Sequence, residues 1–585
     1  MKASDYIIEY LIDKGITNIF GYPGGMVTHL MDSLSKYHEK IKTHLMYHEQ
    51  GASFAACGYA QSSDEIGVAF ATSGPGATNL VTGICNAYFD SIPVLFITGQ
   101  VNSFEGKDKL QIRQRGFQET DIVSMVSNVT KYAAYISDPD KIKWYLDKAF
   151  YEVSCGRKGP VLLDIPMNIM SADVNPGVLH KYQQDHLTND SHQLERYIDL
   201  IMEELKHRNN PVLLIGQGVK SSKSVPLVRR FVAQYKIPTV SSMLAVDVID
   251  DKNQNYGFIG AYGNRTANFI VAKCDLMISL GARLDIRQVG KLRSQFAPSA
   301  MIIRIDIDEG ELSYRVHNDD LSIQADLTNI ISGLLDRKDV KDYSEWNQIC
   351  AYIRKKLNGV DDKAPNYLIR NISKYIPDNA VITTDVGQNQ VWISQSFDIK
   401  TNQKLLFSGG HGAMGYSLPA AIGCSIATGK TVYSFNGDGG IQMNIQELQT
   451  IVRENLPIKI IILNNSALGM IRHFQEMYFD KNYFMTVKEN GYSNPDFEKI
   501  AYAYDIPYQK IDGLSKKIVN PFKADGVEMI EVVFNIDTYV FPKLEYGKPN
   551  QDQEPLLERE LYNLLMDNEE IKMQIQEIQM NQSGK

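Results

Sequence analysis

Two strand-like segments, residues 431–436 and 458–463, constrain the fold of this chain more than any other feature. Gly437-Asp438-Gly439 follows the first segment directly, and Asn464-Asn465 follows the second. The residues between them keep the spacing of an amphipathic helix, so the unit reads as strand, helix, strand. Strands joined in this way are parallel neighbours with a right-handed crossover. The polar loops at their carboxyl ends are therefore predicted to lie side by side.

The chemistry of these two loops predicts a site for a metal ion and a phosphate. Open α/β sheets bind their ligands at the carboxyl edge, where Asp438 and Asn465 are expected. A carboxylate and an amide offer the oxygen ligands that suit Mg²⁺, and the glycines let a phosphorylated group approach the backbone. Within the intervening helix, Asn444 and Glu447 are predicted to form a capping box at the N-terminus.

The same alternation of strand, glycine turn and helix runs through most of the chain. Further strands are predicted at residues 17–20, 42–47, 66–71, 93–98, 211–215, 275–280 and 301–305. This order is typical of doubly wound parallel sheets. We expect an α/β fold with three such domains, at residues 1–172, 190–337 and 365–545, followed by a C-terminal tail at 546–585.

Polar and charged segments are predicted to separate the domains. A linker is expected near residues 180–191, and a charged helical bridge at 338–364. The tail, from Leu556 onward, is rich in Glu, Gln, Asn and Met. It is interpreted as a surface helix with a frayed end, and a helix that binds a partner is the alternative.

Composition excludes several classes of function. The formal net charge is −9 over 585 residues, and we expect no nucleic-acid partner because such proteins concentrate positive charge. No segment approaches the roughly 18 apolar residues of a membrane span, so no membrane partner is expected. The N-terminal residues read as an amphipathic helix and not as a signal peptide. Six cysteines without zinc spacing predict reduced thiols in a cytoplasmic protein.

The motifs extend into a resemblance that covers about residues 1–545. The chain resembles the acetolactate synthase catalytic subunits, within the pyruvate-oxidase-like enzymes that use thiamine diphosphate. The shared stretches are residues 20–25, 48–52, 71–79, 116–119, 280–283, 384–388, 412–415, 437–444, 463–465 and 468–470. The resemblance implies a pyrimidine-binding first domain, a middle domain and a diphosphate-binding third domain.

The resemblance also implies the cofactor contacts. It implies thiamine diphosphate with Mg²⁺, the metal being held by Asp438, Asn465 and the main-chain carbonyl of Ala467. Met414 is implied to be the apolar wedge that bends the cofactor. The other implied cofactor-binding residues are Pro75, Asn79, Val386, Gly387, Gln388, Gly412, Gly437, Gly439, Gly440 and Met470.

Glu49 is the implied catalytic residue. In the family, the matching glutamate hydrogen-bonds the aminopyrimidine ring and favours the imino tautomer that takes a proton from the thiazolium carbon. Alone, a glutamate at a predicted helix start would be read as a charge that offsets the helix dipole. Gly25, Phe117 and Gln118 are implied to face the substrate end of the cofactor.

Two further features follow from the resemblance. The domain that carries the matching glutamate faces the diphosphate-binding domain of another subunit, so we expect a homo-oligomer with active sites between chains. Acetolactate synthases also hold a mostly non-redox FAD in the middle domain. Gly216-Gln217-Gly218 matches only part of a dinucleotide fingerprint, because position 221 is serine. Relatives with this fold lose the flavin, so FAD is left open.

The chain departs from the family where a second substrate should bind. The loop at residues 102–115 is longer and strongly charged, and Asn389 replaces a histidine. His411 stands where a leucine is usual, and Phe474 where a tryptophan is usual. Arg287 is kept, and its guanidinium could bind a carboxylate bidentately. His411, Phe474 and Arg287 are therefore the candidate residues of the substrate pocket.

We expect a carboligase that decarboxylates pyruvate, a small-molecule 2-oxo acid, and transfers the two-carbon unit to an acceptor carbonyl. An acetolactate synthase proper, whose acceptor is a second pyruvate, is the leading hypothesis. The alternatives are a carboligase with another acceptor, such as a keto-sugar nucleotide, and a 2-oxo acid decarboxylase or oxidase. A catalytically silent partner protein is disfavoured by the intact Glu49, Asp438 and Asn465.

Overall fold

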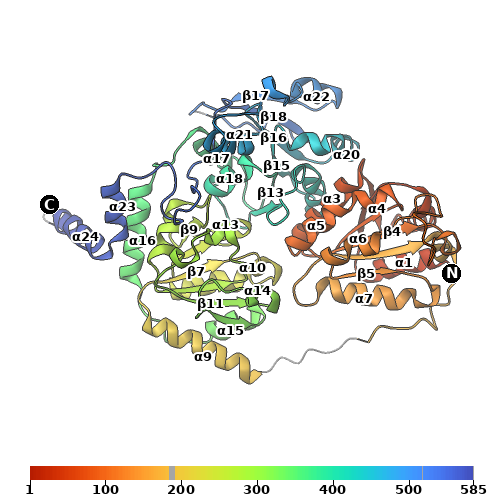
Figure 1. Cartoon of the computed structure of the whole chain (residues 1–585), viewed down its shortest axis with the longest axis horizontal. Coiled ribbons are helices and arrows are strands. Elements are labelled where there is room, and N and C mark those ends of the chain that lie inside the picture. The colour runs from red at the N-terminus through yellow and green to blue at the C-terminus, as the bar shows by residue number, and fades with distance from the viewer. Residues whose placement is uncertain (184–190, 517, 584–585) are drawn as a thin grey trace.

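The computed structural model describes residues 1–183, 191–516 and 518–583. Within these residues the strands form three separate sheets of six strands each, and the paired strands are parallel. Figure 1 shows the first sheet, in red and orange, on the right and the third above the middle one. The predicted α/β fold with three parallel sheets is confirmed. The boundaries between domains stay predictions.

The first sheet has the strand order β2-β1-β3-β4-β6-β5. Its strands are β1 Asn18–Gly21, β2 Lys42–Leu45, β3 Gly67–Ala71, β4 Val94–Gln100, β5 Tyr132–Tyr135 and β6 Val161–Pro166. The helices around it are α1 Ala3–Asp13, α2 Thr28–Lys36, α3 Glu49–Ser63, α4 Pro75–Asn79, α5 Val81–Phe89, α6 Ile122–Val126, α7 Ile142–Ser154 and α8 Met167–Ser171. The four strands predicted in this region are all present, with ends shifted by a residue or two.

The middle sheet has the order β12-β11-β10-β7-β8-β9. Its strands are β7 Pro211–Ile215, β8 Thr239–Ser241, β9 Asn255–Phe258, β10 Leu276–Leu280, β11 Met301–Asp306 and β12 Leu321–Gln324. Its helices are α9 Ser191–His207, α10 Gly218–Ser221, α11 Val225–Tyr235, α12 Arg265–Lys273, α13 Ile286–Val289, α14 Glu309–Ser313 and α15 Leu327–Leu335. Helix α16, Ser344–Leu357, occupies the predicted charged bridge. Most of the predicted linker, residues 184–190, lies outside the described residues.

The third sheet has the order β14-β13-β15-β16-β18-β17. Its strands are β13 Val381–Thr384, β14 Lys404–Phe407, β15 Val432–Gly437, β16 Ile458–Asn464, β17 Tyr508–Asp512 and β18 Glu528–Val533. Its helices are α17 Ala364–Ser373, α18 Gln388–Ser396, α19 Ser417–Thr428, α20 Leu448–Arg453, α21 Gly469–Tyr478 and α22 Phe497–Ala503. Strands β15 and β16 are parallel neighbours, with Gly437 opposite Leu463, as predicted.

The connection between β15 and β16 corrects one prediction. A 3₁₀ segment, η7 Ile441–Glu447, precedes the short helix α20, and Asn444 has non-helical backbone angles inside η7. Asn444 and Glu447 form no capping box. The Glu447 carboxylate instead accepts hydrogen bonds from backbone amides near Glu49, in the first domain. Local sequence spacing could not reveal this partner, because about four hundred residues separate the two segments.

The first and third domains pack against each other through helices α3 and α19. A Cβ atom on Gly423 would lie 1.8 Å from the carbonyl oxygen of Ala55, and one on Gly58 would lie 2.2 Å from that of Ala420. Both distances are far below van der Waals contact, so only glycine fits at these positions. The backbones of the two helices are therefore in direct contact, and this contact fixes how the two domains sit.

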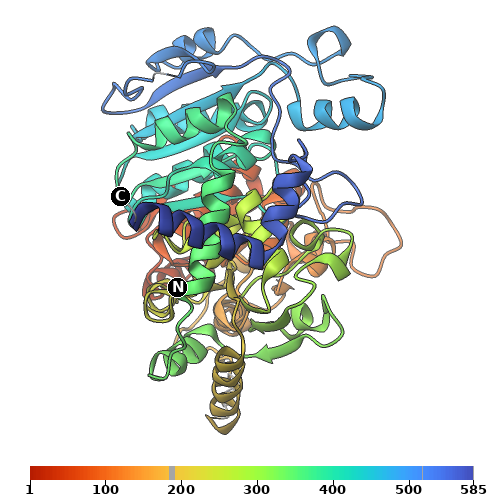
Figure 2. The ribbon, with the colours of Figure 1, turned by 90° about the vertical axis from the view of Figure 1, so that its left-hand side faces the viewer.

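The C-terminal tail forms two helices and not one, α23 Arg559–Met566 and α24 Asn568–Ser583. Figure 2 shows α24, in dark blue, lying across α16. Leu565 and Ile571 are fully buried in the hydrophobic core of the middle domain. The Lys273 ammonium, buried in the same region, donates a 2.7 Å hydrogen bond to the carbonyl of Leu565. The tail is thus a packed part of the middle domain, and the surface-helix prediction holds only for its last turns.

Candidate active site

The carboxyl edge of the third sheet carries a buried carboxylate without a counter-charge. Asp438 follows β15 directly, and its Oδ2 atom is buried without a hydrogen-bond partner. Burial raises the pKa of Asp438 to about 7, although the amides of Gly439 and Ala467 and the nearby Tyr492 hydroxyl favour the charged form. A cation bound here would compensate the buried charge, so the residues present fit a metal site.

The other two predicted metal ligands lie on the loop after β16. Asn465 is buried, and its side-chain amide donates a 2.9 Å hydrogen bond to Gln388 Oε1. That bond leaves the Asn465 carbonyl oxygen as the acceptor end of the side chain, the end that binds a cation. Gln388 in turn donates to the carbonyl of Thr538 at 3.1 Å. The side chain of Gln388 therefore orients Asn465, whereas its backbone belongs to the predicted phosphate cradle.

The resemblance implies that the backbone of Val386, Gly387, Gln388, Gly439 and Gly440 holds the diphosphate. These residues and the 412–415 turn, which carries the implied cofactor-binding residues Gly412 and Met414, are called the cradle. Gly387 and Gly412 have φ angles of +90° and +68°, and nothing lies where a side chain would stand. Left-handed angles of this kind favour glycine. Val386, between β13 and α18, adds its backbone to the same turn. Open backbone turns at the start of a helix are suited to binding an anion.

Asp385 holds this cradle together, and the sequence did not single it out. Its buried carboxylate accepts hydrogen bonds from the amides of Val386, at 2.7 Å, and Gly415, at 2.9 Å. A Cβ atom on Gly440 would lie 2.6 Å from Asp385 Oδ2, so the carboxylate can approach this segment only because residue 440 has no side chain. One side chain thereby ties three cradle segments together. Its only sequence signal is its place in the Thr-Asp-Val-Gly turn after β13.

The apolar residues of the predicted site lie next to this cradle. The Met414 methyl is 3.6 Å from the position of a Cβ on Gly439, and Met414 is partly exposed. The wedge role implied for Met414 stays a prediction. Met470, on α21, packs against the hydrophobic core of the third domain. Gly437 ends β15, beside the Asn389 side chain.

In the first domain, Glu49 is the first residue of helix α3 and is buried. Asn79, at the end of α4, donates a 2.9 Å hydrogen bond to Glu49 Oε2. A Cβ on Gly76 would lie 3.1 Å from Glu49 Oε1, so the Pro75-Gly76 turn leaves room for that oxygen. The structure thus groups Glu49, Pro75 and Asn79 at one edge of the first sheet.

The predicted substrate-facing residues surround the same edge. Gln118 has a φ angle of +64° and lies against Gly74, in the turn before Pro75. Its neighbour Phe117 is 79% exposed. Gly25 begins a 3₁₀ turn in open space. The substrate-facing roles of Gly25, Phe117 and Gln118 stay predictions.

The two halves of the predicted site are carried by different domains. In the part of the chain that the structure describes, Glu49 hydrogen-bonds Asn79 through its side chain and makes no such bond with Asp438 or Asn465. The Asp438 half lies on the third domain, and the Glu49 half lies on the first.

The candidate acceptor residues fall into different surroundings. His411 stacks on Phe89, with ring centroids 5.8 Å apart, and partial burial lowers its pKa. Asp90, next to Phe89, accepts hydrogen bonds from the amides of Gly409 and Gly410 at 2.9 and 2.7 Å. The carboxylate therefore fastens the loop that carries His411, and burial raises the pKa of Asp90 to about 6. Sequence reasoning missed this role.

Phe474 is about half exposed and lies against Tyr478 and Phe479. Arg287 is exposed on α13, near the Tyr262 ring. Asn389, the replacement for the expected histidine, lies beside the turn after β13. Its side chain is buried, accepts from the Thr384 hydroxyl at 2.8 Å and donates to the Val386 carbonyl at 2.9 Å. It holds the cradle turn.

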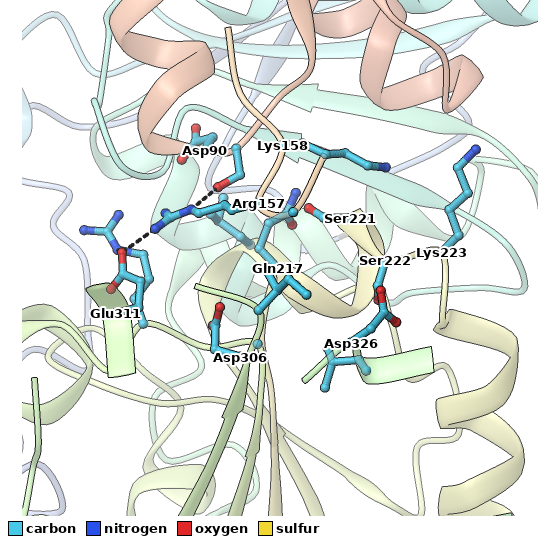
Figure 3. Close-up of a pocket in the computed structure, with 18 of the residues that line it drawn as sticks. Asp90, Arg157, Lys158, Gln217, Ser221, Ser222, Lys223, Asp306, Glu311 and Asp326 are labelled. Carbon is cyan, nitrogen blue, oxygen red and sulfur yellow. Dashed lines mark hydrogen bonds and ion pairs between the residues drawn. The ribbon is translucent and has the colours of Figure 1, made fainter. Parts of the chain in front are cut away.

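A cavity of about 310 Å³ lies at the carboxyl edge of the middle sheet. Asp306 ends β11, Gln217 follows β7 and Asp326 follows β12, so adjacent strands supply its wall. Figure 3 shows Arg157, from the first domain, reaching across this cavity toward Glu311. A second cavity of about 90 Å³ shares four lining residues with it and continues to Gly409 and Gly410.

Comparison with known proteins decides the family. Profiles described as the N-terminal TPP binding domain, the central domain and the C-terminal TPP binding domain of thiamine pyrophosphate enzymes match residues 1–125, 198–334 and 385–532. The chain belongs to the thiamine pyrophosphate enzymes. Each of the three profiles covers most of the strands of one sheet.

Among these enzymes, the chain is similar to acetolactate synthase large subunits. It is 34% identical to the acetolactate synthase isozyme 2 large subunit of Escherichia coli, over 94% of this chain and 99% of the relative. It is 35% identical to the acetolactate synthase large subunit of Lactococcus lactis, over 93% and 95%. The chloroplastic acetolactate synthase 1 of Zea mays is 34% identical, over 94% and 88%. The cofactor of this family is thiamine diphosphate, with Mg²⁺ as its usual partner. None of the helices described is long and apolar enough to cross a membrane.

Proposed function

We propose that this thiamine pyrophosphate enzyme is a carboligase that decarboxylates pyruvate and transfers the two-carbon unit to an acceptor carbonyl. A second pyruvate as acceptor would give 2-acetolactate. The observation that carries this proposal is the buried carboxylate of Asp438, whose Oδ2 atom has no hydrogen-bond partner, beside Asn465. The relatives named acetolactate synthase support the choice of reaction.

We assign a role to the metal-site residues and to Glu49 from the resemblance and from their contacts. Thiamine diphosphate, when bound, supplies a carbon nucleophile that adds to a 2-oxo acid and holds the electrons released with CO₂. Asp438, Asn465 and the Ala467 carbonyl would hold Mg²⁺. Asn79 occupies one oxygen of Glu49 and leaves Oε1 to accept a hydrogen bond or move a proton.

We further propose that two chains form each site. The Glu49 half and the Asp438 half lie on different domains, and each is flanked by exposed apolar side chains. On the first domain these are Phe104 and Phe117, and on the third they are Phe479, Phe484 and Met485, all more than half exposed. Exposed apolar side chains gathered in this way are typical of an interface. A two-fold dimer would cover both faces and bring each Glu49 to the partner's cofactor.

Mixed dimers test this arrangement. Glu49→Gln and Asp438→Ala chains carrying different affinity tags are co-expressed, and only dimers with both tags are purified. If the site lies between chains, each mixed dimer has one intact site and about half of wild-type activity, while both parent dimers are inactive. Mixed dimers as inactive as their parents would refute a shared site. Dimers of Glu39→Gln and Asp378→Ala, which change exposed carboxylates, are the matched control.

A specific observation favours a different acceptor as the second candidate. The 102–115 loop exposes Lys109, Arg113 and Arg115, and Glu119 holds it in shape by accepting from the Lys107 and Arg115 amides. Preorganised cations suit a phosphorylated acceptor, such as a keto-sugar nucleotide. With pyruvate alone, acetolactate formation selects the first candidate. Carboligation only after a nucleotide-linked ketone is added selects the second, and CO₂ with acetaldehyde selects a decarboxylase.

We propose FAD as the ligand of the middle cavity. The two cavities share four lining residues and lie at the edge of the sheet where nucleotides bind. Arg157, Lys158 and Arg283 offer cations for a diphosphate, and Asp306 and Asp326 offer acceptors for hydroxyl groups. The visible absorption spectrum of the purified protein tests this proposal. A spectrum without flavin bands, unchanged after incubation with FAD and desalting, would contradict it.

A further inference from the structure

The buried carboxylate of Glu447 contacts the two residues that precede Glu49. Glu447 ends η7 in the third domain and is completely buried. Its Oε1 atom accepts hydrogen bonds from the amides of Tyr47 and His48, both at 3.0 Å. Its Oε2 atom accepts from the Thr450 hydroxyl at 3.1 Å. A carboxylate of the third domain thus binds the backbone of the first.

These contacts set where helix α3 begins. Glu49 is its first residue, and the His48 ring caps it by accepting from the Gln50 amide at 3.0 Å. A negative charge at a helix N-terminus is stabilising, and unbonded amides in a buried turn are costly. Burial raises the pKa of Glu447 to about 7, whereas the amides, Thr450 and Arg453 favour its charged form.

Gly51 shows how closely the carboxylate fits. A Cβ atom on Gly51 would lie 2.5 Å from Glu447 Oε1. The helix can approach the carboxylate because this position carries no side chain. Asn444 makes a second hydrogen-bonded link near that of Glu447. Its side-chain amide donates to Gln50 Oε1 at 3.0 Å and to the Gly415 carbonyl at 2.9 Å. The 441–447 segment therefore links the cradle segments to the first turn of α3.

We propose that Glu447 is a positioning residue: its carboxylate fixes the Tyr47-His48 backbone and thereby the place of the Glu49 side chain. The inference rests on the proposed role of Glu49. Loss of the carboxylate frees the turn to shift, and a displacement of about 1 Å at a catalytic group can cost about 100-fold in rate.

Hydrogen–deuterium exchange at the thiazolium carbon of bound thiamine diphosphate measures the step that Glu49 is proposed to assist. At saturating cofactor and Mg²⁺, Glu447→Ala should slow this exchange about 100-fold. Cofactor affinity, measured by titration, should change by only a few-fold. Glu447→Gln keeps an oxygen for both amides, so it should recover most of the exchange rate. Gly51→Ala, which pushes the carboxylate away, should slow the exchange while Glu447 is intact.

Glu454→Ala is the matched control. Glu454 also crosses the boundary between the first and third domains, and it contacts His44 of β2 at 2.6 Å, whereas the Tyr47 and His48 amides are bonded by Glu447. Its loss should lower thermal stability without slowing the exchange. Wild-type exchange in both Glu447→Ala and Gly51→Ala would overturn the inference, and so would equal slowing in Glu454→Ala. If the wild-type protein does not accelerate the exchange, or Glu49→Gln keeps it, the proposed function fails instead.

Discussion

Replacing Asp385 by alanine should open the cofactor cradle even without the cofactor. The buried carboxylate accepts from the amides of Val386 and Gly415, and alanine leaves both without a partner. Each buried amide that loses its bond costs about 1–3 kcal/mol, so the local cost is about 2–6 kcal/mol. The smaller value corresponds to about 30-fold faster local opening, since 1.4 kcal/mol is tenfold.

Hydrogen exchange followed by mass spectrometry is the appropriate assay, because it reports opening of individual segments in a chain with several domains. In the apo-protein, peptides that contain Val386 and Gly415 should exchange at least about 30-fold faster in Asp385→Ala than in the wild type. Peptides from the first sheet should be unaffected. Asp378→Ala, at an exposed position of the same domain, is the control. Unchanged protection of both cradle peptides would refute the reasoning.

The charge of Asp385 adds a pH dependence with a definite sign. Burial raises its pKa from 3.8 to about 7 in the folded protein. Its contribution to stability is therefore complete below pH 3.8 and is lost as the pH rises through about 7. The difference of about three units corresponds to about 4 kcal/mol. Protection of the cradle, corrected for intrinsic exchange, should fall as the pH rises from about 4 to about 7 in the wild type. This fall should vanish in Asp385→Asn, whose amide stays neutral.

Four further variants test the site and the domain contact. Glu49→Gln should keep cofactor binding by titration but lose about 10²- to 10⁴-fold in kcat, and near-normal turnover would contradict its role. Asp438→Ala should abolish Mg²⁺-dependent retention of thiamine diphosphate on desalting; retention equal to wild type would exclude it as a ligand. Phe474→Trp should lower kcat/KM about tenfold for a bulky acceptor while sparing pyruvate, and equal effects on both would remove it from the acceptor pocket. Gly423→Ala should destabilise the protein by about 1–3 kcal/mol or more, seen as a lower Tm, whereas Gly526→Ala, with open space around it, should not.

The fold and the cofactor edge could be predicted because their signals are local. Strand-like runs followed by glycine turns mark β15 and β16, and one helix between them is enough to make them parallel neighbours. Asp438 and Asn465 then reach the same edge by topology alone. The His-Glu-Gln-Gly stretch placed Glu49 at a helix start in the same way. No knowledge of distant contacts was needed for these residues.

The residues that hold the site together could not be predicted in this way. Glu447 fits a capping-box spacing, and only tertiary structure shows that its carboxylate binds Tyr47 and His48 instead. Asp90 accepts backbone amides 319 and 320 residues away, and Asp385 accepts the Gly415 amide, 30 residues away, as well as that of its neighbour Val386. The sequence around each carboxylate carries no signal of the distant partner. Carboxylates that bind amides of another segment have no periodicity or motif, which is why sequence reasoning misses them.

The position of the tail has a consequence for dividing this protein into parts. The middle sheet ends at residue 324, yet Leu565 and Ile571 fill its core. The guanidinium of Arg265 donates to the carbonyls of Gln553 and Pro555 at 2.8 and 2.7 Å. A middle domain expressed alone as residues 190–337 would expose this core. It would also leave the buried side chains of Arg265 and Lys273 without their hydrogen-bond acceptors. The unit that folds as the middle domain is therefore discontinuous, and residues 553–571 must be synthesised before it is complete.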